Sequence, residues 1–383
     1  MSNLDIANIR EKIDGIDAQM VALFRERMKV AREVAQYKQQ RGLPILDAGR
    51  ERAVLCKVAE MAGEDLEQYA KLVYTALFDV SRSHQRAAME LHSEMSEAIE
   101  AALKDAPEAF PTKAAVACQG VEGAYSQQAC DRMFAFPSIL YFSSFDSVFT
   151  AVEKGLCRYG VLPIENSAAG SVTQVYDLME RHQFHIVRGI RQRIDHALLA
   201  NEGAQLSGVT QILSHPQGIA QCSQFLAAHP QIEVIPVENT AVAAKKVAES
   251  GRTDMAAIAS VRCAALYNLV PLDAQVADTD NNYTRFIVIG KGLEIFPSAN
   301  KISLMLNLSH EPGALGRIIS RFSAMGLNLT KLESRPIPGR EFEFRFYFDI
   351  EASLSDPNVV KLLEDIRRGS EKFVLLGNYQ EGY

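Results

Sequence analysis

Two basic side chains near the N-terminus lie within an otherwise apolar helical stripe. Apolar residues recur every three or four positions from Ile6 to Tyr37, a spacing that predicts one long helix whose stripe faces other helices. Arg27 falls on this stripe, and Lys38 lies about three helical turns further on. A cation in a helix seam loses its hydration, so it needs an acidic partner or an anionic ligand. Two cations on one face favour a ligand, and the plainer alternative is a salt bridge from Arg27 to Glu51.

Polar side chains on two further helical segments are expected to face the same space. A Gly-Leu-Pro break ends the first helix, and Asp47 can cap a second helix in which Glu51 shares an apolar stripe. A third helical pattern runs from about residue 64 toward residue 103 and carries Ser81 and Gln85, which lie four positions apart. Three helices would then contribute polar groups to one pocket.

The region from 113 to 292 alternates short apolar runs with loops and amphipathic helices, which predicts an α/β domain. Four of its loops follow or precede a strand and carry polar groups where backbone N–H groups gather and anions bind. Each loop alone is equally consistent with a turn or a helix cap. The four loops span 120–126, 163–167, 214–217 and 282–286, and the six expected strands span 114–118, 159–164, 209–214, 232–237, 254–260 and 285–290.

The C-terminal region, residues 300 to 380, has the order strand, helix, strand, strand, helix, strand. This βαββαβ order predicts a ferredoxin-like module. A His-Glu-Pro-Gly-Ala-Leu segment at 310–315 links its first strand to its first helix, and Glu-Ser-Arg-Pro at 333–336 ends its second strand. A second linker, residues 292–300, is expected to precede the module.

Length and composition bound the remaining possibilities. The 383 residues exceed one ordinary core, and we expect a helical domain at 1–104, a linker at 105–112, and the domains at 113–292 and 300–380. A net charge of -7 argues against a nucleic-acid or anionic-membrane binder. No signal peptide or membrane span is apparent, so a cytoplasmic location is expected. The six cysteines are widely spaced, and His182 with His185 has no third ligand nearby, so no metal site is expected.

The polar set of the helical segment resembles the active site of the all-helical chorismate mutases. Residue type and spacing match together at eight positions within about 85 residues: Arg10, Arg27, Lys38, Asp47, Arg50, Glu51, Ser81 and Gln85. The resemblance implies an intertwined dimer. Arg10 lies about 260° around the helix from Arg27, so it is expected to reach the pocket of a second chain.

The resemblance also assigns roles for the conversion of chorismate to prephenate, a pericyclic step that needs no nucleophile. Such a reaction is accelerated by holding a reactive conformer and stabilising charge on the ether oxygen. Arg10, Arg27 and Ser81 would hold the two carboxylates, and Lys38 and Gln85 would donate to the ether oxygen. The ring hydroxyl would bind to Glu51 and Asp47, and Arg50 would brace the site.

The four loops of the middle region, taken in order, resemble prephenate dehydratase. The Thr-Arg-Phe triplet at 284–286 is the most specific mark. The family fold is two α/β lobes around a cleft, like a type II periplasmic binding protein, with the chain crossing between lobes near 190 and 270. Dehydration with decarboxylation needs a proton for the leaving hydroxyl. The resemblance makes Thr284 the candidate for delivering that proton, with substrate bound by Glu165, Asn166, Ser214, Gln221 and Arg285.

The C-terminal module resembles the ACT domains of the same enzymes, which pair and bind phenylalanine at their interface. The resemblance implies an effector site formed by Gly313, Ala314, Leu315, Asn328, Leu329, Glu333, Ser334 and Arg335. The whole chain thus resembles the bifunctional chorismate mutase/prephenate dehydratase family. The resemblance implies chorismate, prephenate and L-phenylalanine as small-molecule partners, a homodimer or higher homo-oligomer, and no cofactor.

Two other hypotheses remain open at this point. The middle domain could prefer arogenate to prephenate. Alternatively, the chain could be a ligand sensor without catalysis, whose helical segment only dimerises. A dimerisation helix would gain nothing from Arg27 in its seam, which favours the enzyme.

Overall fold

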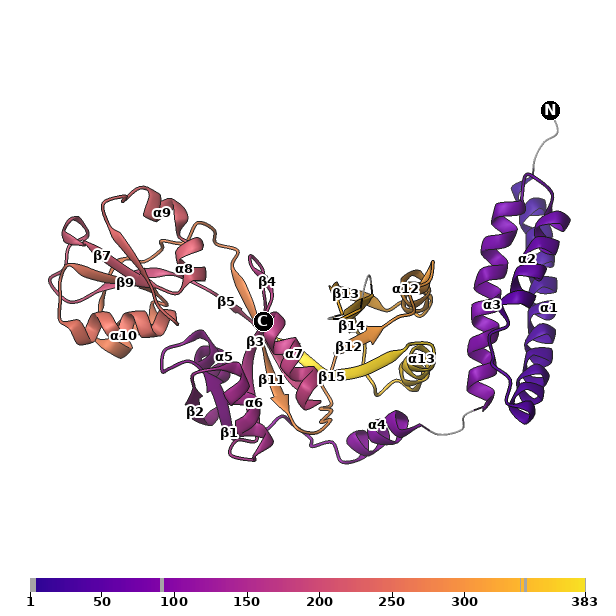
Figure 1. Ribbon diagram of the computed structural model, residues 1–383, viewed down its shortest axis with the longest axis horizontal. Coiled ribbons are helices and arrows are strands. Elements are labelled where there is room, and N and C mark those ends of the chain that lie inside the picture. The colour runs from indigo at the N-terminus through magenta and orange to yellow at the C-terminus, as the bar shows by residue number, and fades with distance from the viewer. Residues whose placement is uncertain (1–4, 90–92, 338, 341–342, 383) are drawn as a thin grey trace.

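The N-terminal helices form an elongated hairpin bundle. The computed structural model describes residues 5–89, 93–337, 339–340 and 343–382. Helix α1 (Ile6–Arg41) packs against α3 (Glu67–Met89), which also packs against α2 (Ala48–Ala62) (Figure 1). Asp47 caps α2 by accepting a hydrogen bond from the Arg50 backbone N–H at 2.9 Å. The prediction of one long first helix and of the Asp47 cap is confirmed.

The third helical pattern was predicted as one element, and that prediction is wrong. α3 ends at Met89, and a separate helix α4 (Glu94–Lys104) begins after Ser93, whose hydroxyl accepts from the Ser96 N–H at 3.1 Å. α4 does not join the hairpin bundle. It packs instead on the C-terminal module, where Ile99 is 1% exposed in that module's core. The apolar period continues through both helices, so it could not reveal the change of partner.

Two α/β lobes make up the middle of the chain (Figure 1). Lobe 1 pairs its strands in the order β5-β11-β3-β1-β2, with β4 beside β3, and lobe 2 in the order β10-β6-β9-β7-β8. Lobe 1 contains β1 (Lys113–Gln119), α5 (Tyr125–Met133), β2 (Phe136–Phe142), α6 (Phe145–Glu153), β3 (Tyr159–Asn166), β4 (Gly170–Ser171), α7 (Thr173–His182), β5 (His185–Arg193) and β11 (Tyr283–Gly290). Lobe 2 contains β6 (Ala197–Ala200), the short 3-10 helix η1 (Leu206–Gly208), β7 (Gln211–Ser214), α8 (Pro216–Ala220), α9 (Ser223–Ala227), β8 (Glu233–Pro236), α10 (Thr240–Ser250), β9 (Met255–Ala259), α11 (Arg262–Tyr267) and β10 (Val270–Asp273).

All six strands expected in this region are present. The chain crosses between the lobes at 194–196 and again at 274–282, the second crossing lying slightly later than the expected position near 270. Four other strands of at least four residues, β2, β5, β6 and β10, were not predicted. β5 carries His185, Arg188, Arg191 and Arg193 among its apolar residues, and β6 and β10 have only four residues each, so hydrophobic runs gave little signal there.

The C-terminal module has the predicted βαββαβ order. Its strands pair antiparallel in the order β13-β14-β12-β15, with both helices packed on the sheet's core. The elements are β12 (Lys301–Asn307), α12 (Ala314–Ala324), β13 (Asn328–Pro336), β14 (Phe344–Glu351), α13 (Pro357–Arg368) and β15 (Lys372–Gly382). β15 runs past its module and pairs in parallel with β5 at residues 380–382, which joins this sheet to that of lobe 1.

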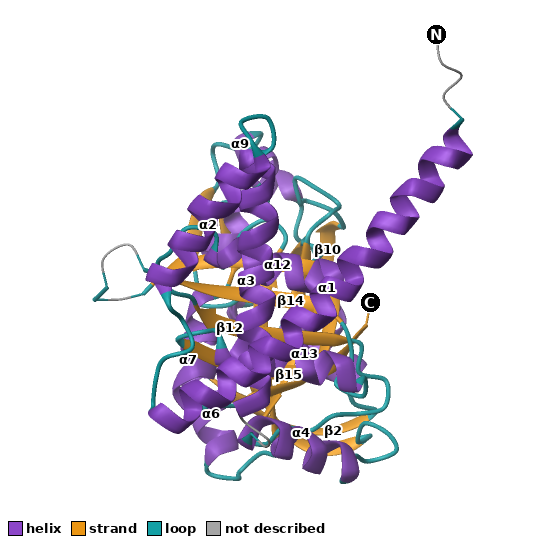
Figure 2. Cartoon of the chain, turned by 90° about the vertical axis from the view of Figure 1, so that its right-hand side faces the viewer, coloured by secondary structure: helices purple, strands orange, loops and turns teal. Residues whose placement is uncertain are grey.

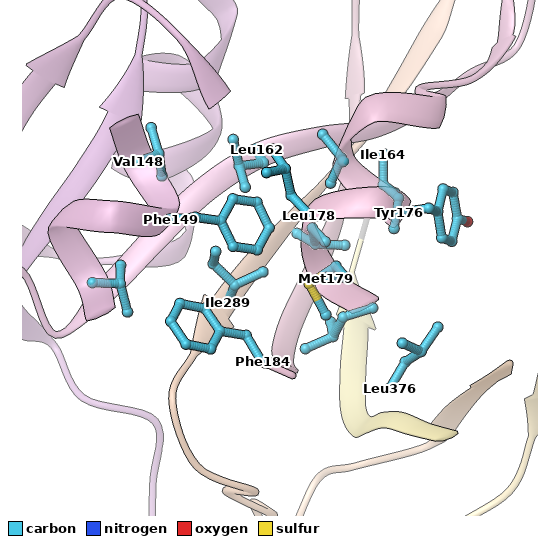
Figure 3. Close-up of a cluster of buried hydrophobic side chains, with 14 of the residues drawn as sticks. Val148, Phe149, Leu162, Ile164, Tyr176, Leu178, Met179, Phe184, Ile289 and Leu376 are labelled. Carbon is cyan, nitrogen blue, oxygen red and sulfur yellow. The ribbon is translucent and has the colours of Figure 1, made fainter. Parts of the chain in front are cut away.

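Lobe 1 and the C-terminal module also share one hydrophobic core. Phe149, Leu162 and Met179 of lobe 1 belong to the same cluster as Leu376 and Tyr379 of β15 (Figure 3). The segment 292–300 that was expected to be a linker is packed as well, because Ile295 and Phe296 are 1% and 3% exposed. The C-terminal module is therefore packed against lobe 1 and not joined to it by a free linker.

The first helix leaves much of its apolar stripe uncovered. In Figure 2 the N-terminal part of α1 projects away from the other elements. Ile13, Ile16, Met20 and Leu23 are all at least half exposed, although the sequence predicts that they face other helices. The buried α1 residues are instead small or flexible ones near its middle, such as Ala31 and Met28.

Candidate functional sites

A cavity of about 420 Å³ opens between the three helices of the N-terminal bundle. The structure brings seven of the eight predicted side chains to its wall: Arg27, Lys38, Asp47, Arg50, Glu51, Ser81 and Gln85. Arg82, Tyr74 and Phe78 complete the polar and aromatic lining. The eighth predicted residue, Arg10, is exposed on α1 and does not line this cavity.

Arg27 is held in this cavity with an unsatisfied donor. Its Nη1 is buried without a hydrogen-bond partner among the described residues, and its guanidinium lies 5.7 Å from the centre of the Phe78 ring. Burial lowers the pKa of Arg27, although Tyr74 and Glu51 oppose this shift. The alternative of an Arg27–Glu51 salt bridge is not what the structure shows, because the Glu51 carboxylate pairs with Arg82. A buried guanidinium with a free donor suits an incoming carboxylate.

The remaining polar groups of this cavity are positioned by local hydrogen bonds. The Lys38 ammonium donates to the backbone oxygen of Ile45, which holds it at the cavity edge. The Gln85 amide lies 3.5 Å from the Ser81 hydroxyl, and its own Oε1 is buried without a hydrogen-bond partner in the described chain. Cations and an amide at the wall of one hollow suit binding of an anion in a fixed conformation.

A second cavity, of about 350 Å³, lies between the two α/β lobes. Thr284, Asn166 and Gln221 of the predicted set line it. Four other wall residues belong to the predicted loops but were not named as site residues: Tyr125, Ser126, His215 and Gln217. A fifth, His196, lies at the first crossing between the lobes. Their common signal is position at the start of a helix or at the crossing between lobes.

Thr284 and Asn166 form the polar pair at the floor of this cavity. They lie opposite one another on the paired strands β11 and β3, and the Asn166 amide donates to Thr284 Oγ1 at 2.9 Å. The same amide nitrogen lies 2.9 Å from Asn282 Oδ1, while Asn166 Oδ1 accepts from the Ala168 and Ala169 N–H groups. These bonds fix the amide orientation. Thr284 therefore receives a hydrogen bond and keeps its own proton for another acceptor.

Two imidazoles line the cavity, and burial favours the neutral form of both. Burial lowers the pKa of His196, and its Nε2 lies 2.9 Å from Gln221 Oε1, a contact that only partly offsets burial. Burial also lowers the pKa of His215, whose Nδ1 accepts from the Gln217 N–H at 3.2 Å. Among the described lining residues there is no lysine or arginine. Positive potential must come from backbone N–H groups, and the first turns of α5 and α10 both reach the wall.

Glu165 and Arg285 do not lie beside Thr284, which corrects the expectation that both bind substrate there. Each is the strand neighbour of a cavity residue, and strand neighbours point to opposite faces of a sheet. Arg285 is 7% exposed and pairs with Asp349 at 2.5 Å, with Glu381 at 2.5 Å and with Glu165 at 3.5 Å. Glu165 and Arg285 line a separate hollow of about 510 Å³ on the face toward the C-terminal module.

Ser214 also lies outside the cavity wall, contrary to expectation. It is fully buried, and its hydroxyl donates to the backbone oxygen of Ile258 at 2.8 Å, which ties β7 to β9. A Cβ on Gly218 would lie 2.7 Å from the Ser214 Oγ, so the first turn of α8 packs directly on it. Ser214 supports the cavity from behind.

The predicted effector residues divide between two places in the C-terminal module. Ala314 and Leu315 line a small hollow of about 120 Å³ at the start of α12, where Gly313 takes a φ of +79°. Asn328 begins β13 and donates to Glu351 at 2.7 Å, Leu329 packs on the module's core, and Ser334 is exposed.

The other two predicted effector residues hold lobe 1 instead. Glu333 accepts a hydrogen bond from Ser171 of β4, and the Arg335 guanidinium lies 4.7 Å from the centre of the Tyr176 ring on α7. Arg335 also pairs with Glu333 at 2.8 Å. The Glu-Ser-Arg segment thus contacts the lobe through alternate residues.

Comparisons with known proteins follow the same three divisions. Family models for chorismate mutase type II, prephenate dehydratase and the ACT domain match residues 9–86, 116–293 and 303–368. The bifunctional chorismate mutase/prephenate dehydratase of Escherichia coli K12 is 31% identical over 380 residues, covering 97% of this chain and 95% of that protein. The chain belongs to the bifunctional chorismate mutase/prephenate dehydratase family. It is an enzyme with both activities, which excludes a sensor without catalysis.

Other similar proteins match only part of this chain. An Arabidopsis thaliana protein named arogenate dehydratase/prephenate dehydratase 2, chloroplastic, is 36% identical over 69% of this chain and 72% of its own length. The crystal structure of prephenate dehydratase in complex with L-Phe from Arthrobacter aurescens matches with a TM-score of 0.63 and 27% identity, over 69% of this chain and 89% of that one.

Two other features are absent from the described residues. None of the helices in 5–89, 93–337, 339–340 and 343–382 is both long and apolar enough to cross a membrane. Within the same ranges no group of three or more His, Cys, Asp or Glu side chains could hold a metal ion.

Proposed function

We propose that the cavity of the helical bundle is the mutase site, with Arg27, Lys38, Asp47, Arg50, Glu51, Ser81 and Gln85 in the roles set out from the sequence. The observation that carries this proposal is that Arg27 lines the cavity while its buried Nη1 has no hydrogen-bond partner in the described chain. A substrate carboxylate would satisfy that donor. Lys38 and Gln85 would then stabilise charge on the ether oxygen as the carbon–oxygen bond breaks.

We further propose that the enzyme is a homodimer in which Arg10 enters the mutase cavity of the second chain. Two observations support this: Arg10 is exposed and outside its own cavity, and the apolar stripe of α1 is uncovered in the single chain. A long apolar helix face on a soluble chain normally marks an interface.

Complementation between two variants tests the shared site. Arg10→Ala and Arg27→Ala are each expected to lose mutase activity. In a mixed dimer one cavity carries both changes and the other carries neither, so random reassortment should restore about a quarter of wild-type activity. A mixture that stays inactive after reassortment would place Arg10 and Arg27 of one chain in the same cavity, and an active Arg10→Ala protein would place Arg10 in no cavity.

The interlobe cavity is proposed to be the dehydratase site, with Thr284 donating to the hydroxyl that leaves the ring. The bond between the ring and its carboxylate breaks and releases carbon dioxide, its electron pair enters the ring, and the carbon–oxygen bond at the opposite ring carbon breaks. The departing hydroxide takes up a proton to become water. Thr284 is suited to this because Asn166 occupies one of its lone pairs and orients the hydroxyl proton toward the cavity. Gln221 and the first turns of α5 and α10 would hold the carboxylates.

Prephenate rather than arogenate is the proposed dehydratase substrate. Arogenate carries an ammonium group where prephenate has a ketone, so it calls for an acidic partner. Glu238 is the one carboxylate among the described lining residues, and Lys246 lies 3.6 Å from it. The name of the Arabidopsis relative keeps arogenate as the second candidate. Comparing kcat/KM for the two compounds decides between them, and a higher value for arogenate would refute the proposal.

The C-terminal module is proposed to bind L-phenylalanine and inhibit the dehydratase. The L-Phe complex of the Arthrobacter aurescens protein supports the ligand. The hollow at Ala314 and Leu315 would take the ring, and the backbone at Gly313 would meet the carboxylate at the start of α12. Titration calorimetry of the whole chain with phenylalanine should give saturable heat that Leu315→Asp removes. Equal heat from both proteins would rule out this hollow.

A cytoplasmic location is proposed as well. The six cysteines are all free thiols, five of them buried, which suits a reducing compartment. Non-reducing electrophoresis of the protein taken directly from cells should show no disulfide-linked species, and cross-linked chains would contradict the proposal.

A further inference from the structure

Arg82 is a cavity residue that the sequence comparison did not single out. It lies next to Ser81 on α3 and lines the mutase cavity. Its Nη1 lies 2.5 Å and 2.6 Å from the two carboxylate oxygens of Glu51. Both side chains are largely withdrawn from solvent, at 17% and 26% exposure, so the contact is stronger than a surface ion pair. Arg82 therefore fixes the orientation of the carboxylate proposed to receive the ring hydroxyl.

The same guanidinium begins a line of alternating charges that leaves the cavity. Arg82 Nη2 lies 3.6 Å from Asp79, and Asp79 lies 3.0 Å from Arg321 on α12 of the C-terminal module. Arg321 in turn lies 2.7 Å from Asp365 on α13, to which Arg86 of α3 comes within 3.6 Å. The side chains of this line beyond Glu51 are 15–18% exposed, so water screens them weakly.

We infer that Arg82 is a positioning residue of the mutase site whose hold on Glu51 is set by Arg321 of the regulatory module. The inference rests on the proposed mutase site. Arg82 is shared between two carboxylates, Glu51 and Asp79. Arg321 pairs with Asp79 and offsets its negative charge, so Asp79 competes less with Glu51 for the Arg82 guanidinium. Without Arg321, Asp79 attracts Arg82 more strongly and Glu51 loses its orientation.

This arrangement gives the regulatory module a route to the mutase that bypasses the dehydratase lobes. α12, which carries Arg321, begins at the hollow where phenylalanine is proposed to bind. A shift of this helix would move Arg321 relative to Asp79. The result would be a change in chorismate turnover rather than in chorismate affinity, because Arg27 would still hold the carboxylate.

The experiment measures mutase kcat and KM in full-length variants without phenylalanine, with dehydratase turnover of prephenate as the folding control. Arg82→Ala should lower mutase kcat about tenfold, with little change in KM, since one charge-assisted hydrogen-bond pair is lost. Arg82→Lys keeps the charge and should recover part of that loss. Arg321→Gln should lower kcat by roughly two- to tenfold through the pair coupling.

Two further variants separate this mechanism from a structural tether between modules. Arg317→Gln removes the same charge from the same helix, but Arg317 pairs with Glu311 on its own module, so mutase kcat should stay at the wild-type value. Adding Asp79→Asn to Arg321→Gln removes the competing carboxylate and should raise kcat back toward wild type. A tether would instead lose more activity with each broken contact.

The inference is overturned if Arg82→Ala leaves mutase kcat unchanged, if Arg321→Gln and Arg317→Gln act alike, or if Asp79→Asn deepens the Arg321→Gln defect. If Arg82→Ala does not fold, the Arg82→Lys and Arg321→Gln results decide. A wild-type chain that consumed no chorismate would remove the proposed mutase site as well. If the wild type consumes chorismate and the variants have the same mutase kcat, this inference is refuted and the proposed mutase site is not.

Discussion

Replacing Arg27 by methionine should make the helical bundle more stable while removing mutase activity. Methionine keeps an unbranched apolar stem of similar reach, so the helix seam stays filled. The buried Nη1 has no hydrogen-bond partner in the described chain, and such an unsatisfied group costs about 1–3 kcal/mol. The substitution is therefore expected to add about 1–2 kcal/mol to the opening free energy of α1 and α3, which slows local amide exchange roughly 5- to 30-fold.

The catalytic loss from this substitution should be much larger than the gain in stability. A guanidinium that grips a carboxylate makes two charge-assisted hydrogen bonds, each worth about 1.5–3 kcal/mol. Losing both lowers kcat/KM by roughly 10²- to 10⁴-fold.

Hydrogen exchange on the full-length chain measures the change in opening free energy, and a chorismate assay on the same preparations measures the loss of kcat/KM. Arg25→Met is the matched control, because Arg25 is an exposed arginine two positions earlier on α1. It should leave turnover unchanged. If Arg27→Met loosens α1 and α3, or keeps chorismate turnover near wild type, then Arg27 serves the fold and the account of the cavity is wrong.

Three further outcomes follow from other contacts. Gly123→Ala should impair the dehydratase but not the mutase and weaken the packing between the two lobes by about 2–4 kcal/mol. The φ of Gly123 is +89°, and the new Cβ would lie 2.9 Å from a methyl group of Leu266 on α11 of lobe 2. Gly155→Ala, with φ of +74° and open space, should cost only the backbone strain in thermal unfolding. Burial opposes ionisation of Glu364, but hydrogen bonds from the hydroxyls of Ser93 and Ser96 outweigh burial and lower the pKa of Glu364 below the ordinary 4.5. The stability that this carboxylate contributes to the fold is therefore present above pH 4.5 and lost as the pH falls below it. Amide exchange in α4 should then accelerate below pH 4.5 in the wild type, beyond the intrinsic pH dependence, whereas Glu364→Gln should show no such step. Arg285→Met should cost about 3–5 kcal/mol because Asp349 stays buried without its closest cation, and an unchanged thermal midpoint would show that the pair carries little stability.

The sequence predicted most elements because their signals are local. The three- to four-residue spacing of α1, the cap at Asp47 and the βαββαβ order of the C-terminal module each depend on residues near in sequence. The division between α3 and α4 was missed for the opposite reason. Ser93 caps α4 and also donates to Glu364, 271 positions away, so only the tertiary structure shows that α4 packs on α13.

The candidate sites were likewise predicted only as far as local patterns determine them. Arg27, Lys38 and Gln85 were placed correctly in one cavity because helical spacing fixes which side chains share a face. The dehydratase set was read from short motifs, and there neighbours such as Thr284 and Arg285 were assigned to one cavity although strand alternation sends them to opposite faces. Arg82 was overlooked because its closest partner, Glu51, lies on α2. Its helix neighbour Asp79 connects it to Arg321 of another module, and no local pattern shows either link.

The central claim is that one chain carries two separate active sites, and a progress curve started from chorismate tests it most directly. Arg27→Met should leave chorismate unconverted yet turn added prephenate into phenylpyruvate at the wild-type rate. Thr284→Val should consume chorismate at the wild-type rate and accumulate prephenate. If either variant, while retaining the wild-type fold, loses both conversions, or if Thr284→Val still forms phenylpyruvate at the wild-type rate, the assignment of the two cavities is contradicted.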